Sequence, residues 1–235
     1  MSENATPFEF YYSDSRFAEQ FPQIRAALRE RRGEVLGDRM DSPKRKRLIL
    51  KVNLNGKFYV IKQEFFIFRF DRSLKAFLFG SDARAVFKVS RHAQEQSFSG
   101  IPKTFFVAER FSKGVLRETV SVTEFLEGSG LSLPLEPELA RELETLITRC
   151  HALGIISGDI QTANFIRTPE GLKLIDFRGK KVIPWLAKIR DRIQIQRVFG
   201  IKYDGRDSLS GKIFFALLAC RNAVRKIFGK EKIPD

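Results

Sequence analysis

The stretch HALGIISGDIQTANFI (residues 151–166), followed by LKLIDFRG (residues 172–179), decides the fold of this chain. Asp159 and Asn164 lie five residues apart, in a segment whose Gly and Ser residues predict a loop. Asp176 stands at the end of the apolar run LKLI, which predicts a short strand. A loop next to a strand end allows these three side chains to meet in one pocket.

The three side chains suit phosphoryl transfer. One carboxylate can orient an acceptor hydroxyl and take its proton, while two further oxygen ligands hold Mg²⁺ against nucleotide phosphates. An Asp five residues before an Asn is by itself a common turn pattern. The preceding helix, the loop and a strand ending in Asp176-Phe177 form a much rarer combination, which favours a functional site.

The residues before this stretch predict an antiparallel sheet with helices. Asn55-Gly56 is a strong hairpin signal between two β-rich runs, and Lys113-Gly114 joins two more. Strands are predicted over 48–54, 57–62, 103–108 and 116–125, and helices over 14–32, 73–98 and from Pro137 to Gly154. The layout predicts an α+β, two-lobed chain: an N-lobe over 1–123, a hinge over 124–130 and a small, mostly helical C-lobe over 131–235.

The composition is that of a globular chain that carries an excess of positive charge. With 43% hydrophobic residues, 23 of them Phe, the 235-residue chain can bury a core. Its net charge is +14, and residues 178–235 hold 15 Lys and Arg against 5 Asp and Glu. The two cysteines lie in apolar, helix-like surroundings, which predicts buried thiols. The charge excess predicts an anionic partner, either nucleic acid or a membrane surface.

The C-terminal segment favours a membrane surface over nucleic acid. Base-stacking aromatic residues do not interleave its basic ones, and it carries no nucleic-acid motif. From Ile213 to Phe228 apolar residues alternate with basic ones at helical spacing, which indicates a basic amphipathic helix. Such a helix either lies on a membrane or packs its apolar face on the core. No leader and no membrane-spanning run is expected.

Three motifs resemble the protein kinase-like superfamily. Ser157-Gly158-Asp159 is similar to the His-Arg-Asp of the catalytic loop, and Asp176-Phe177-Arg178-Gly179 to the metal-binding motif. Tyr59-Val60-Ile61-Lys62 resembles the strand motif Val-Ala-Ile-Lys. The resemblance implies a protein kinase-like fold.

A narrower resemblance covers most of the chain. It is carried by IISGD (155–159), NFI (164–166), IDFRGKK (175–181), KIRDRI (188–193) and FGIK (199–202), and is to the lipopolysaccharide core heptose(II) kinase family. It implies ATP-dependent phosphorylation of an inner-core heptose, most simply heptose II, at the cytoplasmic face of a Gram-negative inner membrane. Another inner-core sugar, heptose I or Kdo, remains an alternative, as does a degenerate kinase fold acting as a basic scaffold.

The resemblance assigns roles residue by residue. Asp159 matches the catalytic base, Asn164 and Asp176 the Mg²⁺ ligands, and Lys62 the lysine that binds the ATP phosphates. The acidic partner of this lysine is expected to be Glu95, with Asp82 as the alternative.

Further expectations and two departures complete the match. Asp191 resembles a structural aspartate that braces the catalytic loop. Ser157 replaces the usual histidine, and no Gly-x-Gly-x-x-Gly precedes Lys62, where residues 37–42 are the nearest substitute. The expected partners are the inner-core glycolipid and, peripherally, an anionic membrane surface, with no nucleic acid.

Overall fold

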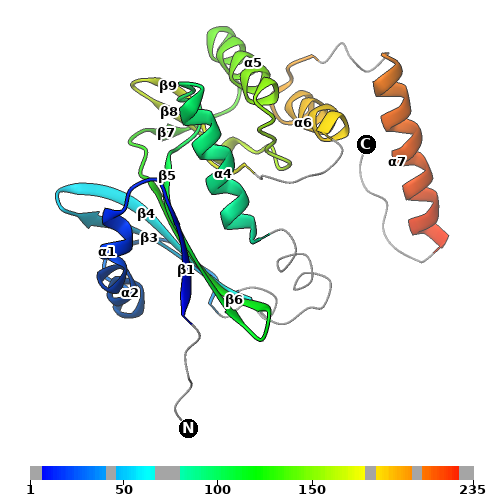
Figure 1. Cartoon of the computed structure of the whole chain (residues 1–235). Helices are drawn as coiled ribbons and strands as arrows, with labels where there is room; N and C mark the ends of the chain where they lie inside the picture. The colour runs from blue at the N-terminus through cyan, green and yellow to red at the C-terminus, as the bar shows by residue number, and fades with distance from the viewer. Residues whose placement is uncertain (1–6, 41–45, 67–79, 178–183, 203–207, 228–235) are drawn as a thin grey trace.

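The computed structural model describes residues 7–40, 46–66, 80–177, 184–202 and 208–227 and contains two sheets (Figure 1). The strands are β1 (Phe8–Tyr12), β2 (Glu34–Asp38), β3 (Lys46–Leu54), β4 (Lys57–Phe65), β5 (Thr104–Ser112), β6 (Val115–Glu124), β7 (Ser129–Gly130), β8 (Phe165–Thr168) and β9 (Gly171–Leu174). The helices are α1 (Arg16–Glu19), α2 (Phe21–Glu30), α4 (Asp82–Glu95), α5 (Pro137–Ala152), α6 (Pro184–Phe199) and α7 (Leu209–Ile227), with a 3₁₀ turn η1 (Thr162–Asn164).

The larger sheet has the order β1-β5-β6-β4-β3-β2, and every neighbouring pair is antiparallel. Both predicted hairpins are confirmed. Asn55 and Gly56 have φ angles of 54° and 83°, the left-handed pair that a two-residue hairpin turn requires, and Lys113 and Gly114 do the same between β5 and β6. Strand β4 lies between β3 and β6, which places Lys62 in the middle of the sheet.

Helices cover both faces of this sheet (Figure 1). On one face α1 buries Phe17 and α2 buries Phe21 and Ile24. They pack against apolar residues of the strands, among them Leu50 and Ile61. On the other face α4 packs on β5 and β6. Because successive strand residues point to opposite faces, Ile61 faces α2, and its neighbour Lys62 faces the other side.

The second core holds the C-terminal elements together. Helix α5, which begins and ends where the sequence predicts, buries Leu143 and Ile147 against Phe165 and Leu174 of the small sheet β7-β8-β9. The α+β, two-lobed arrangement is confirmed. Of the predicted helix over 73–98, residues 82–95 form α4; residues 73–79, Arg178-Gly179 and part of the 37–42 segment lie outside the described residues.

Helix α7 lies beside α6 at the edge of the molecule (Figure 1). Leu209, Ile213 and Leu217, four residues apart, expose 76%, 42% and 51% of their surface, so this stripe is not packed on the core. Cys150 is buried as expected, but Cys220 on α7 is exposed, so the expectation of two buried thiols is wrong for Cys220. No described helix is both long and apolar enough to cross a bilayer.

Candidate functional site

Asp159 lies half-buried in the loop between α5 and β8, and a buried aspartate of α6 fixes this loop. Asp191, fully buried, accepts hydrogen bonds from the Gly158 N–H at 2.9 Å and the Ser157 N–H at 3.0 Å. Nε2 of His151 lies 3.2 Å from Oδ2 of Asp191. Because buried N–H groups need an acceptor, Asp191 sets the backbone directly before Asp159. The expected bracing contacts of Asp191 are therefore present.

The Ser157 hydroxyl connects this loop to the segment after β9. Its Oγ lies 3.1 Å from the carbonyl oxygen of Asp159 and 3.2 Å from that of Asp176, and it accepts from the Asp159 N–H at 3.3 Å. A buried serine thus provides the link between the two aspartate segments at the position where the superfamily has histidine.

Asn164 completes the group of predicted residues. Its Nδ2 donates to the carbonyl oxygen of Asp159 at 2.7 Å, which leaves its side-chain oxygen to face other groups. The Ile175 N–H donates to the carbonyl oxygen of Asn164 at 2.9 Å. Asp176 is the residue directly after this contact. Through these backbone contacts the structure brings together the segments that carry Asp159, Asn164 and Asp176.

Asn164 and Asp176 each carry a side-chain oxygen of the kind that binds Mg²⁺. Asp176 is exposed and Asn164 is half-buried, so both side chains are accessible. Among the described residues no three His, Cys, Asp or Glu side chains cluster as metal ligands. Mg²⁺ at phosphate-transfer sites usually takes only one or two carboxylates beside substrate phosphates, so a small oxygen set is sufficient.

Gln161 is a site residue that the motifs do not identify. Its Nε2 donates to Oδ1 of Asp159 at 2.9 Å, so it holds one oxygen of this carboxylate. Gln161 itself is exposed. The available signal in the sequence is its position in the same loop, two residues after Asp159.

Lys62 has a different acidic neighbour from the expected one. Its Nζ forms an ion pair with Oε1 of Glu64 at 3.3 Å, and Glu64 is buried. Glu95 lies on the exposed surface of α4, where it pairs with Arg91 at 3.1 Å, and Asp82 is exposed at the first residue of α4. The structure therefore places neither Glu95 nor Asp82 as the partner of Lys62.

The thiol beneath the loop is not a nucleophile. Burial, with a smaller contribution from the negative charge of Asp191, raises the pKa of Cys150 to about 12. The thiol therefore stays protonated near neutral pH.

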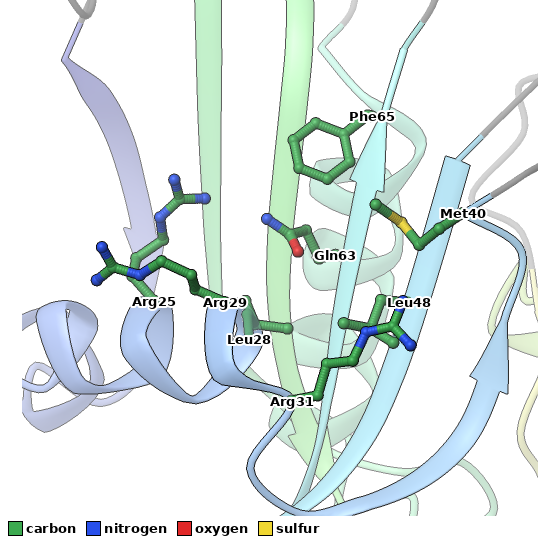
Figure 2. Close-up of a pocket in the computed structure, with 8 residues that line it drawn as sticks. All are labelled: Arg25, Leu28, Arg29, Arg31, Met40, Leu48, Gln63 and Phe65. Atoms are coloured by element: carbon green, nitrogen blue, oxygen red, sulfur yellow. The ribbon is translucent and has the colours of Figure 1, made fainter.

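A cavity of about 410 Å³ lies away from these residues, between α2 and the β3–β4 ladder (Figure 2). Arg25, Leu28, Arg29, Arg31, Met40, Leu48, Gln63 and Phe65 line it. It belongs to the face of the sheet that α2 covers, whereas Lys62 points to the opposite face. The cavity and the Asp159 group are therefore separate features.

A family model and two curated relatives indicate the same family. The family model described as lipopolysaccharide core biosynthesis protein (WaaY) matches residues 44–231. Two proteins named lipopolysaccharide core heptose(II) kinase WaaY are similar to this chain. The one from Escherichia coli strain K12 is 26% identical over 164 residues, 69% of this chain and 70% of that protein. A second from Escherichia coli is 27% identical over 232 residues, 95% of this chain and 96% of that protein.

A solved structure shows the same fold. WaaP in complex with acyl carrier protein superposes with a TM-score of 0.54 and 17% identity, covering 93% of this chain and 91% of that one. The chain therefore has a kinase-like fold.

Proposed function

Since this chain belongs to the lipopolysaccharide core biosynthesis protein (WaaY) family, and is a phosphotransferase, we propose that it phosphorylates a heptose of the lipopolysaccharide inner core. ATP is the proposed phosphoryl donor. Heptose II is the proposed acceptor, because the relatives named above are heptose(II) kinases.

In the proposed mechanism Asp159 orients the acceptor hydroxyl and takes its proton. The hydroxyl oxygen forms a bond to the γ-phosphorus while the bond from that phosphorus to the bridging oxygen breaks, and ADP leaves. Gln161 holds Oδ1 of Asp159, and Asp191 fixes the backbone before it, so the carboxylate is positioned before substrate binds. Asn164 and Asp176 would hold Mg²⁺, which neutralises negative charge on the phosphates when bound.

Lys62 is proposed to bind the ATP phosphates, with Glu64 in place of Glu95 as the acid that positions it. Both side chains lie on one face of β4, two residues apart, and their 3.3 Å ion pair joins a half-exposed lysine to a buried carboxylate. The Glu64 carboxylate is buried and held by the sheet, whereas the Lys62 ammonium group is partly exposed to solvent.

The acceptor is a lipid-linked polyanion, which gives the basic C-terminal region a partner. Residues 178–235 hold ten more basic than acidic side chains, and α7 exposes an apolar stripe. We place the enzyme peripherally on the cytoplasmic face of the inner membrane, with α7 against the lipid surface.

The observation that carries the proposed function is the group formed by Asp159, Asn164 and Asp176 on a loop fixed by Asp191. Purified protein with radiolabelled ATP, Mg²⁺ and core-truncated lipopolysaccharide is expected to label the acceptor. Asp159→Asn is expected to lower the rate by a factor of about 10² or more. Glu138→Gln, which alters an exposed carboxylate in the first turn of α5, is the control and keeps the rate.

Mass spectrometry and NMR of the product distinguish heptose II from heptose I and Kdo. Absence of labelling by the folded wild type, or equal labelling by Asp159→Asn, would contradict the proposed function. Stabilisation by MgATP without any transfer would instead support the scaffold alternative.

A further inference from the structure

The cavity between α2 and the β3–β4 ladder joins an apolar floor to a rim of arginines (Figure 2). Leu28 and Leu48 are 3% and 2% exposed and close the bottom, with Met40 and Phe65 on the sheet side. Its volume of about 410 Å³ falls within the range of small-molecule sites, roughly 300–1,000 Å³.

One buried carboxylate neutralises only part of the positive charge at the cavity. Glu118 of β6 is fully buried and pairs with both Arg25 and Arg110, the latter at 2.9 Å. Gln63 also donates to Glu118, at 2.6 Å. Two guanidinium groups therefore share one carboxylate, so this cluster has a net charge of +1; of its two arginines, Arg25 lines the cavity and Arg110 lies beside it on β5.

The arginines at the end of α2 add to this excess. Arg31 pairs with Asp38 at 2.9 Å, but both side chains are partly exposed, so this pair is open to exchange with a ligand. Arg29, four residues after Arg25 on the same helix, has no ion-pair partner in the described part of the chain. Helix-end cations are favourable without any ligand, but that effect does not account for a cavity beneath them.

A further cation lies beside the rim. Lys46, the first residue of β3, is paired with Phe65 across the ladder and is exposed. It belongs to the basic run that the sequence places before β3, and it is on the same face of the sheet as Leu48. Guanidinium and ammonium groups around apolar walls select an anion attached to an apolar or ring-shaped body, because Arg binds phosphate oxygens through paired N–H donors.

We propose that this cavity is a second ligand site, distinct from the Asp159 group, which binds the phosphate of a phosphomonoester or pyrophosphoryl compound. The phosphate lies at the arginine rim, where Figure 2 shows the guanidinium groups of Arg29 and Arg31 on opposite sides of Leu28, and the remainder of the ligand rests on Met40 and Phe65. The site is independent of the proposed kinase activity, since it lies on the opposite face of the sheet from Lys62.

The chain provides a specific reporter for this site. Met1 and Met40 are its two methionines, and Met40 lines the cavity. With ¹³C-labelled methionine methyl groups, the Met40 resonance is assigned by its loss in Met40→Leu. Sodium pyrophosphate, added without divalent cations, is expected to shift the Met40 signal in a saturable way.

Arg29→Gln/Arg31→Asn tests the rim. Asn at position 31 tolerates the left-handed backbone, φ 53°, that Arg31 adopts, so the fold is kept. This variant is expected to weaken pyrophosphate binding about tenfold or more. Arg32→Gln removes a neighbouring positive charge that pairs with Glu30 and does not line the cavity, so it is the matched control and binds like wild type.

Measurements with lipid nanodiscs distinguish a lipid headgroup from a soluble compound as the source of the phosphate. A Met40 shift with phosphatidic acid in phosphatidylcholine, but not with phosphatidylcholine alone, assigns the site to a lipid headgroup. A shift with pyrophosphate alone assigns it to a soluble phosphate compound. No Met40 shift with either probe overturns the proposal, as does equal weakening by Arg32→Gln and the double variant.

Discussion

Lys62 and Glu64 illustrate how one ion pair defines a site at the scale of single residues. Glu64 is buried, whereas Glu95 is exposed and paired with Arg91. Substitution of Glu64 is therefore expected to affect the proposed nucleotide site, and substitution of Glu95 is not.

Glu64→Gln is expected to raise the KM for ATP about tenfold with a smaller change in kcat, because Lys62 loses the charge that orients its ammonium group. Glu64→Asp keeps the charge and is expected to restore part of the affinity. Glu95→Gln leaves the KM unchanged. Steady-state kinetics with varied ATP measure all three. A raised KM in Glu95→Gln, with none in Glu64→Gln, would contradict the assignment.

The sequence could predict the local part of the site and not the long-range part. Asp159, Asn164 and Asp176 occur within 18 residues, and their spacing alone indicates a loop and a strand end. The acid beside Lys62 depends on which side chains of α4 and β4 face the same space, and helical spacing alone did not settle this. Gln161 carries no motif, so only its 2.9 Å contact with Asp159 identifies it.

At the scale of elements, the hairpins and the amphipathic helices were predictable, whereas the short strands β1, β2 and β7 and the helix α6 were not. β1 is five residues, FEFYY, whose aromatic residues hide any alternation of polar and apolar side chains. β2 is also five residues and contains an irregular register between Val35 and Gly37. Both are edge strands, which the sequence signals weakly because one side lacks a partner.

The segment 124–130, expected to be the hinge, offers a matched pair of glycines. A Cβ on Gly128 would lie 2.2 Å from the carbonyl oxygen of Arg167, whereas a Cβ on Gly130 would have no atom within 4 Å. Gly128→Ala is expected to lower the unfolding free energy by about 2 kcal/mol or more, because backbone must move. Gly130→Ala is expected to change it by less than about 0.5 kcal/mol.

Chemical denaturation followed by circular dichroism measures both glycine variants. Equal stability of Gly128→Ala and Gly130→Ala would show that the β7–β8 contact adjusts to the added Cβ without loss of unfolding free energy. A loss confined to Gly128→Ala would support close packing of this segment against β8.

At the scale of the whole molecule, charge and exposed apolar surface gather toward the C-terminus. The chain carries +14, and α7 adds exposed apolar side chains to the same region. The sequence left open whether α7 packs on the core or stays exposed, because periodicity shows a helix face and not what covers it. The exposed stripe agrees with the second alternative, a helix whose apolar face stays on the surface.

Binding to lipid vesicles tests the role of the exposed α7 surface. The protein is expected to co-sediment with phosphatidylglycerol-containing vesicles at low salt and to be released as salt is raised from about 0.1 M to 1 M, because the screening length falls from roughly 10 to 3 Å. Ile213→Ser/Leu217→Ser is expected to weaken binding about tenfold or more, since each exposed apolar side chain contributes on burial. Ala216→Ser, an exposed position on the same helix, is the control. Binding unchanged by the double variant would contradict the role of α7.

The Lys62–Glu64 pair also bears on control of the reaction. In protein kinases the corresponding lysine pairs with a glutamate of a neighbouring helix, and activation depends on the position of that helix. Here both partners belong to one central strand, so no movement of α4 can separate them. On the proposed assignment, a displacement of α4 leaves Lys62 paired with Glu64 and able to bind the ATP phosphates.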